Sequence, residues 1–410
     1  MENKKLIRWP RLVYGVVTLL FAGIIYAWSI LKAPFEVIPG WGATQLGLNY
    51  TITICFFCIG SFISGMIAKK TSSALRLIVS AVMLFAGFFI VSRIDVSGNV
   101  SSNVAVLYIA YGVISGVGVG FAYNTVLGMT SAWFPDKKGL CSGASLMGFG
   151  LGSFIVGRVA NALGRSENIG WNKTFLIIAI ALGVILVAAS FLVKPPPAGT
   201  VFPAPKARKK ARPTSEVRDY TAKEMIKHPS FIKVFVFVAL VASAGSASIS
   251  FARNIMLDVG STESFAVTIA GILAVFNGAG RLAAGWVFDI LSIKKTMFII
   301  GCLAVIAPLV VVLAITASSF ALGVIGLCLC GFSYGCGSST NIVAAGEIFG
   351  PKNFSLNLSL FTFVLIPAPF AATLAGRIKD VTDGFAPTFL ILAACTAVGF
   401  AVGMTLKKEK

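Results

Sequence analysis

The residue in this sequence with the clearest chemical meaning is an arginine inside an apolar segment, Arg281 in the run Phe276-Asn277-Gly278-Ala279-Gly280-Arg281. An arginine at the centre of a membrane helix costs about 2.5–3.5 kcal/mol even on lenient scales, and it cannot escape by losing its proton. Its planar guanidinium pairs with a carboxylate through two parallel hydrogen bonds. No Asp or Glu stands at mid-depth in any other apolar segment. The sequence therefore favours a substrate carboxylate, rather than a protein carboxylate, as the partner of Arg281.

Two further polar residues accompany Arg281 in the C-terminal half. Asn277 stands one helical turn earlier and shares the same helix face. Its amide could orient the guanidinium, bind substrate, or serve only in helix packing. Asp258 stands near the outer end of its segment, beside Arg253. We expect Asp258 to be the proton acceptor of this half, with a solvated charge at a helix end as the alternative.

Helices that cross a membrane must position these residues. Hydrophobic residues make up 57% of the 410-residue chain and charged residues 12%, whereas a soluble domain has about 25% charged residues. An apolar run of about 20 residues crosses a bilayer as a helix, because lipid cannot satisfy free backbone groups. We expect an all-α membrane protein with twelve transmembrane helices in two six-helix halves, near residues 10–31, 46–68, 75–93, 103–132, 139–162, 173–193, 230–256, 264–288, 296–316, 319–349, 354–376 and 385–406.

The net charge of +19 has a topological interpretation. The basic residues lie in short loops and tails between apolar segments, which is typical of membrane topology signals and not of nucleic-acid binding. The basic clusters fall on one side of the membrane if the count of helices is right. The sequence therefore predicts a multi-pass protein of the cell membrane with both termini cytoplasmic, and no nucleic-acid partner.

A polar stretch divides the chain. Residues 194–229 contain five prolines close together and the basic run 206–212. We expect a cytoplasmic linker here, between an N-terminal half at 1–193 and a C-terminal half at 230–410. The basic run could bind anionic membrane lipid, or the segment could be a plain tether that carries topology charge.

Glycines relate the two halves. Gly60 and Gly65 match Gly280 and Gly285, and a second pair in the fourth segment, Gly116 and Gly120, matches Gly331 and Gly335 in the tenth. Repeated halves with substrate bound near the midplane are what an alternating-access transporter needs.

The twelve segments, the basic linker and the repeats resemble the major facilitator superfamily. Its signature loop is matched by Gly285-Trp286-Val287-Phe288-Asp289, which Lys294 and Lys295 follow. The resemblance implies that Gly285, Asp289 and Lys294 belong to a gating loop. In the N-terminal counterpart Lys69 stands where the family has Asp, which weakens the charge lock on that side.

A closer likeness is to oxalate/formate antiporters and monocarboxylate transporters. It rests on Tyr26-Ala27-Trp28-Ser29, on Trp133-Phe134-Pro135-Asp136-Lys137-Lys138-Gly139-Leu140, and on the run that ends at Arg281. The resemblance implies that Arg281 and Asn277 bind a carboxylate substrate and that aromatic residues line the cavity: Tyr26, Tyr123, Phe332 and Tyr334. Tyr123 is the preferred hydroxyl donor, although each aromatic residue could serve packing instead. The oxalate transporters carry a lysine near the position of Leu365, and this chain does not.

These features predict a secondary active transporter of small monocarboxylates such as lactate or pyruvate, working by alternating access and coupled to protons. One alternative is an oxalate/formate-type antiporter, in which a counter-anion replaces the proton. Another, of a different class, is a nutrient sensor built on a transporter fold. The single histidine and the eight cysteines form no ligand pattern. We therefore predict no enzyme activity, no metal site and no cofactor.

Overall fold

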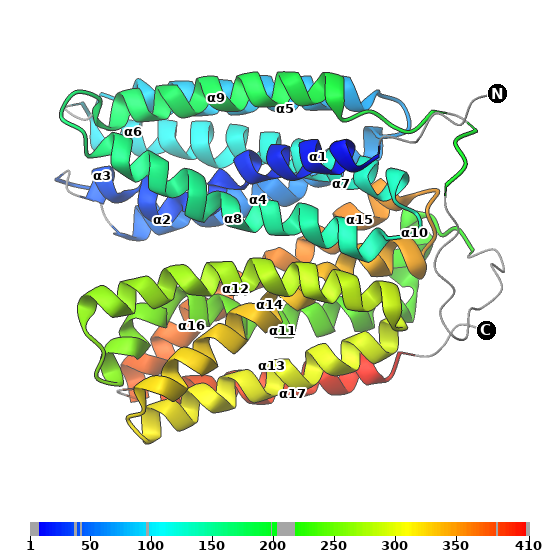
Figure 1. Ribbon diagram of the computed structural model, residues 1–410. Coiled ribbons are helices and arrows are strands. Elements are labelled where there is room, and N and C mark those ends of the chain that lie inside the picture. The colour runs from blue at the N-terminus through cyan, green and yellow to red at the C-terminus, as the bar shows by residue number, and fades with distance from the viewer. Residues whose placement is uncertain are drawn as a thin grey trace. The chain divides into compact units, whose positions relative to one another are not determined.

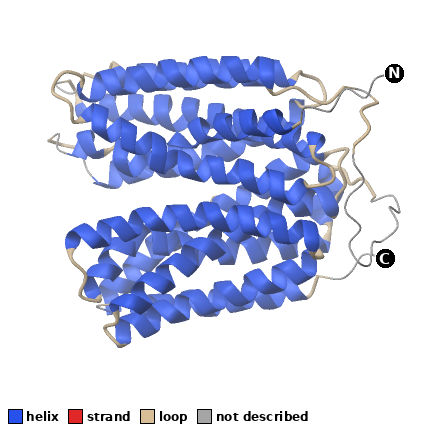
Figure 2. Cartoon of the chain, viewed as in Figure 1, coloured by secondary structure: helices blue, strands red, loops and turns tan. Residues whose placement is uncertain are grey.

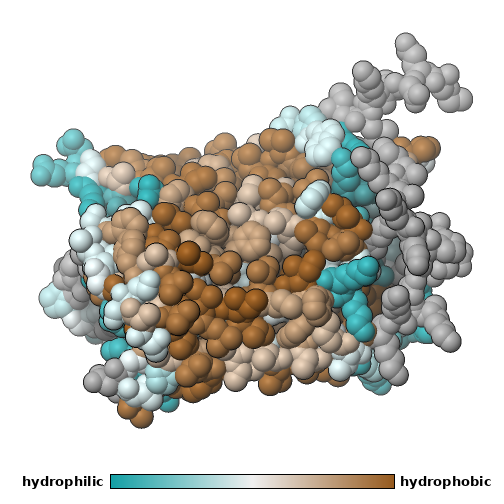
Figure 3. Space-filling model, turned by 60° about the horizontal axis from the view of Figure 1, so that its bottom comes forward, coloured by the Kyte–Doolittle hydropathy of each residue, from teal (hydrophilic) through white to brown (hydrophobic). Residues whose placement is uncertain are grey.

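The computed structural model describes residues 8–36, 39–41, 43–95, 98–197, 199–202, 218–382 and 384–406. Every regular element within these ranges is a helix (Figure 2). Eleven of the helices are long and apolar enough to cross a membrane, and a shorter apolar helix spans Phe354–Leu365. Brown apolar residues dominate the middle of the face shown in Figure 3, and hydrophilic residues lie near its two ends. The predicted all-α membrane fold is confirmed.

Most predicted segments form single helices within a few residues of the expected limits. They are α4 (Ala43–Ile67), α5 (Ser73–Ser92), α8 (Lys138–Gly164), α9 (Gly170–Leu192), α11 (Pro229–Asp258), α12 (Glu263–Ile290), α13 (Ile293–Thr316), α14 (Phe320–Glu347) and α17 (Ala386–Met404). A short helix, α10 (Ala222–Lys227), precedes α11 and begins with a capping box between Thr221 and Glu224. Hydrogen bonds from Thr221 hold the pKa of Glu224 below its ordinary value.

Two predicted segments of the N-terminal half change helix type along their length. The first consists of α1 (Trp9–Ala22), the 3-10 turn η1 (Gly23–Ala27) and α2 (Trp28–Leu31), after which α3 (Ala33–Glu36) follows. The fourth consists of α6 (Val100–Leu107), the π-helix η2 (Tyr108–Ser115) and α7 (Gly116–Trp133). Such local departures from α-geometry are frequent at functional sites and hinges.

The eleventh segment differs from the single helix that we predicted over 354–376. It divides into α15 (Phe354–Thr362), the 3-10 turn η3 (Phe363–Leu365) and α16 (Pro367–Thr382). Pro367 has no backbone N–H to continue the helix, and its ring clashes with the preceding turn. The Ile366 N–H bonds instead to the Phe363 carbonyl, three residues back. Leu365 therefore lies in the interruption and not in a regular helix.

The chain forms two compact units, residues 1–136 with 148–205, and residues 137–147 with 206–410. Helix α8 thus begins in the second unit and belongs to the first from Gly148 onward. The predicted division at 1–193, 194–229 and 230–410 stays a prediction. Residues 203–217 of the predicted linker, with its basic run, lie outside the described residues.

Close helix contacts at glycines hold each unit together. In the first unit a Cβ on Gly60 would overlap the Val117 backbone of α7, and one on Gly120 would overlap the Phe57 carbonyl of α4. In the second unit Gly280 touches the Phe332 carbonyl in the same way. Glycine allows this approach because backbones can meet where no side chain intervenes. The matched glycines Gly60 and Gly280 therefore lie at the same kind of contact, α4 with α7 and α12 with α14, whereas Gly285 packs on Gly139 of α8.

Other helix pairs complete the two cores. Helices α5 and α9 run side by side in the first unit, and α13 and α17 do so in the second (Figure 1). The second core is built from buried aliphatic and aromatic residues of α11, α12, α13, α14 and α17. The N-terminal end of α1 is fixed by a forked ion pair from Arg8 to Asp136, whose second hydrogen bond is 2.9 Å long. Nothing in the sequence pointed to this pair.

Candidate functional site

Arg281 lies inside α12 with 6% of its surface exposed. Its Nη1 donates a hydrogen bond of 2.7 Å to the Leu146 carbonyl oxygen, which belongs to the same unit. Its backbone carbonyl accepts a hydrogen bond from the Ser339 hydroxyl of α14. The helix backbone at this point is therefore fixed, while most of the guanidinium is not.

The guanidinium of Arg281 has capacity for a further ligand. Its Nε has no hydrogen-bond partner, and no Asp or Glu in the described part of the chain forms an ion pair with it. A guanidinium has five N–H donors, and a buried donor without a partner is costly. Among the described residues, no protein carboxylate therefore neutralises Arg281, which argues against that alternative. An incoming carboxylate would find both charge and donors.

Asn277 lies one turn earlier on α12 and is 5% exposed. Its side-chain oxygen has no partner, and its amide makes no hydrogen bond to Arg281. The interpretation that Asn277 orients the guanidinium directly has no support in this geometry. Its amide remains a candidate to bind substrate, since both its donor and its acceptor are available.

Helix α14 supplies the aromatic residues predicted for this unit. The Tyr334 side chain packs on Gly245 of α11 and lies within the electrostatic field of Arg281. Phe332 is half-buried, and its carbonyl is the group that touches Gly280. Gly335, which follows Tyr334, lies against the Asn277 carbonyl, so α12 and α14 meet directly beside Arg281.

Two groups near Arg281 were not predicted from the sequence. Asn341 is 7% exposed and its side-chain oxygen has no partner. It follows Tyr334 by two helical turns on the same face of α14, a spacing that could have found it. The Leu146 carbonyl carries no side-chain signal, so only the fold could bring it to Arg281.

Tyr26 and Tyr123 belong to the first unit. Both rings contact Phe149, with centroids 5.3 and 5.1 Å apart, and Phe57 packs edge-on against Tyr123. Tyr123 is 8% exposed and Tyr26 is half-buried. The structure therefore brings these two predicted tyrosines together in one aromatic cluster. Their action on a shared substrate with Arg281 stays a prediction.

Of the residues predicted for a gating loop, Gly285 and Asp289 belong instead to the last turns of α12, and the Asp289 carboxylate caps another helix. Asp289 accepts hydrogen bonds from the backbone N–H groups of Gly139 and Leu140, each 2.8 Å long, at the start of α8. A negative charge is favoured there because a helix N-terminus carries a partial positive charge. Gly285 packs directly on Gly139, where a Cβ on either glycine would overlap the other's carbonyl. Lys294 lies partly exposed at the start of α13 and makes no bond to Asp289.

Replacing Asp289 by Ala is expected to slow transport and lower the melting temperature, because α8 loses the acceptor of its first N–H groups. Loss of a helix cap costs about 0.5–2 kcal/mol. Asp289→Asn should be intermediate, since one oxygen remains but the charge does not. Lys294→Ala should have little effect. Uptake assays and thermal unfolding of the purified variants check this, and wild-type values for Asp289→Ala would contradict the capping role.

Asp258 is the last residue of α11 and is exposed. Its carboxylate makes no ion pair or hydrogen bond with any described residue, Arg253 included. Its role in proton coupling stays a prediction. The geometry equally fits the alternative of a solvated charge at a helix end.

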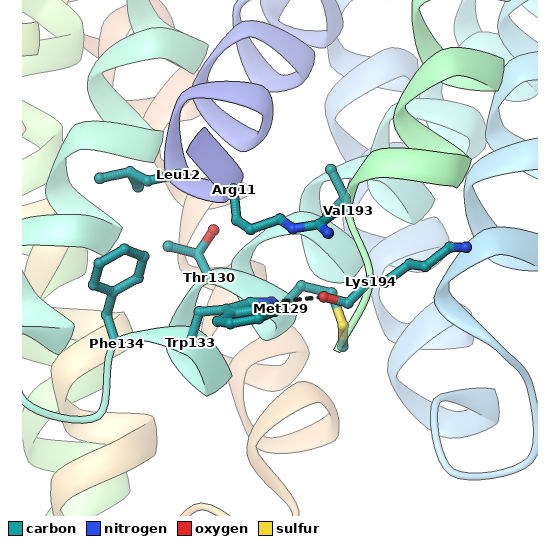
Figure 4. A pocket seen from close by; sticks show the side chains of 8 residues that line it. All are labelled: Arg11, Leu12, Met129, Thr130, Trp133, Phe134, Val193 and Lys194. Atoms are coloured by element: carbon teal, nitrogen blue, oxygen red, sulfur yellow. Dashed lines mark hydrogen bonds between the residues drawn. The ribbon is translucent and has the colours of Figure 1, made fainter. Parts of the chain in front are cut away.

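A separate cleft in the first unit holds none of the predicted site residues. Arg11, Trp133 and Lys194 line it, and the Trp133 indole N–H donates to the Lys194 carbonyl at 2.7 Å (Figure 4). The Arg11 guanidinium also bonds to a backbone carbonyl, that of Leu192. These contacts tie the ends of α1, α7 and α9 together, which is a structural role.

Comparison with known proteins matches this architecture to one family. The family model described as Major Facilitator Superfamily matches residues 12–373. The chain is 25% identical over 403 residues to the oxalate:formate antiporter of Oxalobacter formigenes, covering 96% of this chain and 90% of that protein. It is 21% identical over 398 residues to monocarboxylate transporter 12 of Rattus norvegicus, covering 92% and 80%.

Solved structures agree on the fold. The E. coli fucose:proton symporter FucP superposes with a TM-score of 0.70 at 15% identity, covering 98% of this chain and 99% of that one. The proton:xylose symporter XylE gives 0.68 at 14% identity, covering 96% and 94%. At these identities the likeness concerns the fold alone.

Proposed function

Because this chain belongs to the Major Facilitator Superfamily, we propose that it carries small monocarboxylates such as lactate or pyruvate across the cell membrane by alternating access. The observation that carries the proposal is Arg281, which is buried, charged, without a protein carboxylate among the described residues, and rich in free donors. The relatives support the substrate class, since one is named for oxalate and formate and another for monocarboxylates. The family consists of transporters, and we propose no catalytic role.

In the proposed complex the substrate carboxylate pairs with Arg281, whose fork suits bidentate binding. Asn277 bonds to the substrate's second polar group, and Tyr334 and Phe332 cover its apolar part. Tyr26 and Tyr123 would contribute from the first unit, with the Tyr123 hydroxyl as donor. The glycine contact at Gly335 supports this arrangement, because it holds the α12 backbone in place at Asn277 and Arg281.

The charge of the site favours a monoanion. A second carboxylate in a buried cavity needs a second cation, or it stays desolvated at a cost of several kcal/mol. Neither α15 nor η3 contains a Lys or Arg, and Leu365 occupies η3. Arg281 can neutralise one carboxylate and no more.

Counterflow in liposomes with labelled lactate, pyruvate, formate and oxalate tests the proposal. Lactate or pyruvate should exchange, and excess oxalate should compete poorly. Leu365→Lys is expected to shift preference toward oxalate by adding the missing cation. Oxalate binding as well as lactate would contradict the monocarboxylate proposal. It would favour the second candidate, an oxalate/formate-type antiporter, which the most extensive of these sequence matches supports.

Coupling to protons is the next expected property. An inward gradient of one pH unit supplies about 1.4 kcal/mol per proton, enough for up to about tenfold accumulation. We expect monocarboxylate uptake to rise with such a gradient and Asp258→Asn to weaken the response. Glu167→Gln, which removes another exposed carboxylate, is the matched control. Uptake that ignores the gradient but exchanges one anion for another would instead indicate antiport.

We propose that the basic ends of the helices face the cytoplasm, as do both termini. The positive-inside rule supports this orientation, and a C-terminal epitope that antibody reaches only after permeabilisation would check it. A nutrient sensor remains the alternative of another class. Robust transport by the purified protein in liposomes would exclude a purely sensory role.

A further inference from the structure

The first unit contains a cavity of about 270 Å³ that is remote in sequence from Arg281. It lies where α2 and α3 meet the last turn of α8 and the first turn of α9. Its walls include Leu31, Pro34, Trp171 and Phe175, and Asn161 and Arg165 also line it. It is partly open to the surface, so a ligand could enter without displacing a helix.

The polar groups of this cavity are hydrogen-bond donors without protein partners. The Arg165 guanidinium, the Asn161 amide and the Trp171 indole N–H make no hydrogen bond or ion pair with any residue that the structure describes. Glu167 stands two residues from Arg165 in sequence but does not pair with it. Arg165 and Asn161 are exposed, so they stand at the open side of the cavity. A positive charge and donors without protein partners at that position favour an anion.

The apolar walls are held rigidly. Trp171 and Phe175 meet edge-on with ring centroids 6.1 Å apart. Phe35 contacts both rings at 5.0 and 6.1 Å, and Phe175 packs on Phe88 behind them. A cavity of about 150 Å³ already holds a benzene ring. This larger cavity therefore has room for a ring together with a carboxylate.

We propose that this cavity is a second ligand site, specific for an amphipathic carboxylate with an aromatic body. The ring lies against Trp171 and Phe175, and the carboxylate pairs with Arg165. Asn161 and the Trp171 N–H supply the remaining donors. The site is separate from the proposed transport site, because its lining includes none of the residues assigned to that site.

Phenylacetate binding to the purified full-length protein in neutral detergent tests the proposal by calorimetry. Arg281→Gln serves as the background, which removes the transport site from the measurement. Saturable binding should persist there, and adding Arg165→Gln should weaken it about tenfold or more, as loss of a charged hydrogen-bond pair predicts. Arg165→Lys should retain part of the binding. The uncharged 2-phenylethanol should bind more weakly than phenylacetate.

Lys173→Gln is the matched control, because Lys173 is an exposed cation of the same region whose ammonium bonds to the Asn168 carbonyl. It should leave binding unchanged. Trp171→Phe keeps a ring but loses the N–H, and should weaken binding less than Arg165→Gln does. Binding that is absent from the Arg281→Gln protein, or that Arg165→Gln leaves intact, overturns the proposal. So does equal affinity for phenylacetate and 2-phenylethanol. None of these results depends on what the protein transports.

Discussion

Replacing Arg281 by glutamine is expected to abolish carboxylate uptake while the protein still folds. The substrate loses a charged partner with parallel donors, and each hydrogen bond to a charged group is worth about 1.5–3 kcal/mol, so transport should fall on the order of 100-fold or more. Folding should survive, because the guanidinium holds only the Leu146 carbonyl among the described residues and a glutamine amide can still donate to it. Arg281→Lys should also transport poorly, since an ammonium lacks the planar fork.

Uptake into liposomes and size-exclusion profiles of the purified variants provide the measurement. Arg377→Gln is the matched control, because Arg377 is an exposed arginine in the same unit. It should transport normally. Normal uptake by Arg281→Gln would remove Arg281 from the substrate site and with it the observation on which the proposed function depends.

Replacing Gly335 by leucine is expected to destroy transport and much of the folded protein. A Cβ on Gly335 would overlap the Asn277 carbonyl and approach the Arg281 backbone nitrogen at 3.0 Å. The overlap is with backbone, which cannot move aside as a flexible side chain does, so α12 and α14 must separate. Overpacking of a well-packed contact costs about 1–3 kcal/mol and occasionally more. Separation would also displace Asn277 and Arg281 together.

Thermal unfolding and transport should therefore fall in parallel, with Gly335→Ala less affected than Gly335→Leu. Gly47→Leu is the control, because Gly47 is a glycine of α4 with open space around it. It should behave as wild type. A stable and active Gly335→Leu protein would show that Asn277 and Arg281 keep their positions without the direct contact between α12 and α14.

The sequence by itself determined the helical membrane architecture, because hydropathy over about 20 residues is a local property that lipid makes nearly obligatory. It also singled out Arg281, since a buried arginine is expensive wherever it lies. The matched glycines indicated that the two halves repeat, and Gly60 and Gly280 lie at equivalent helix contacts. In each case the physical reason acts within one helix or on one residue type.

Only the tertiary structure decided which groups surround those residues. The Leu146 carbonyl at Arg281 and the Gly139 N–H at Asp289 are backbone groups without any sequence signal. The cavity at Arg165 draws on α2, α3, α8 and α9, which no local pattern relates. Pro367 was visible in the sequence, but whether a proline kinks a helix or divides it depends on what its neighbours offer the freed backbone groups. Non-local packing settled these points, because it alone brings segments distant in the chain within hydrogen-bonding distance.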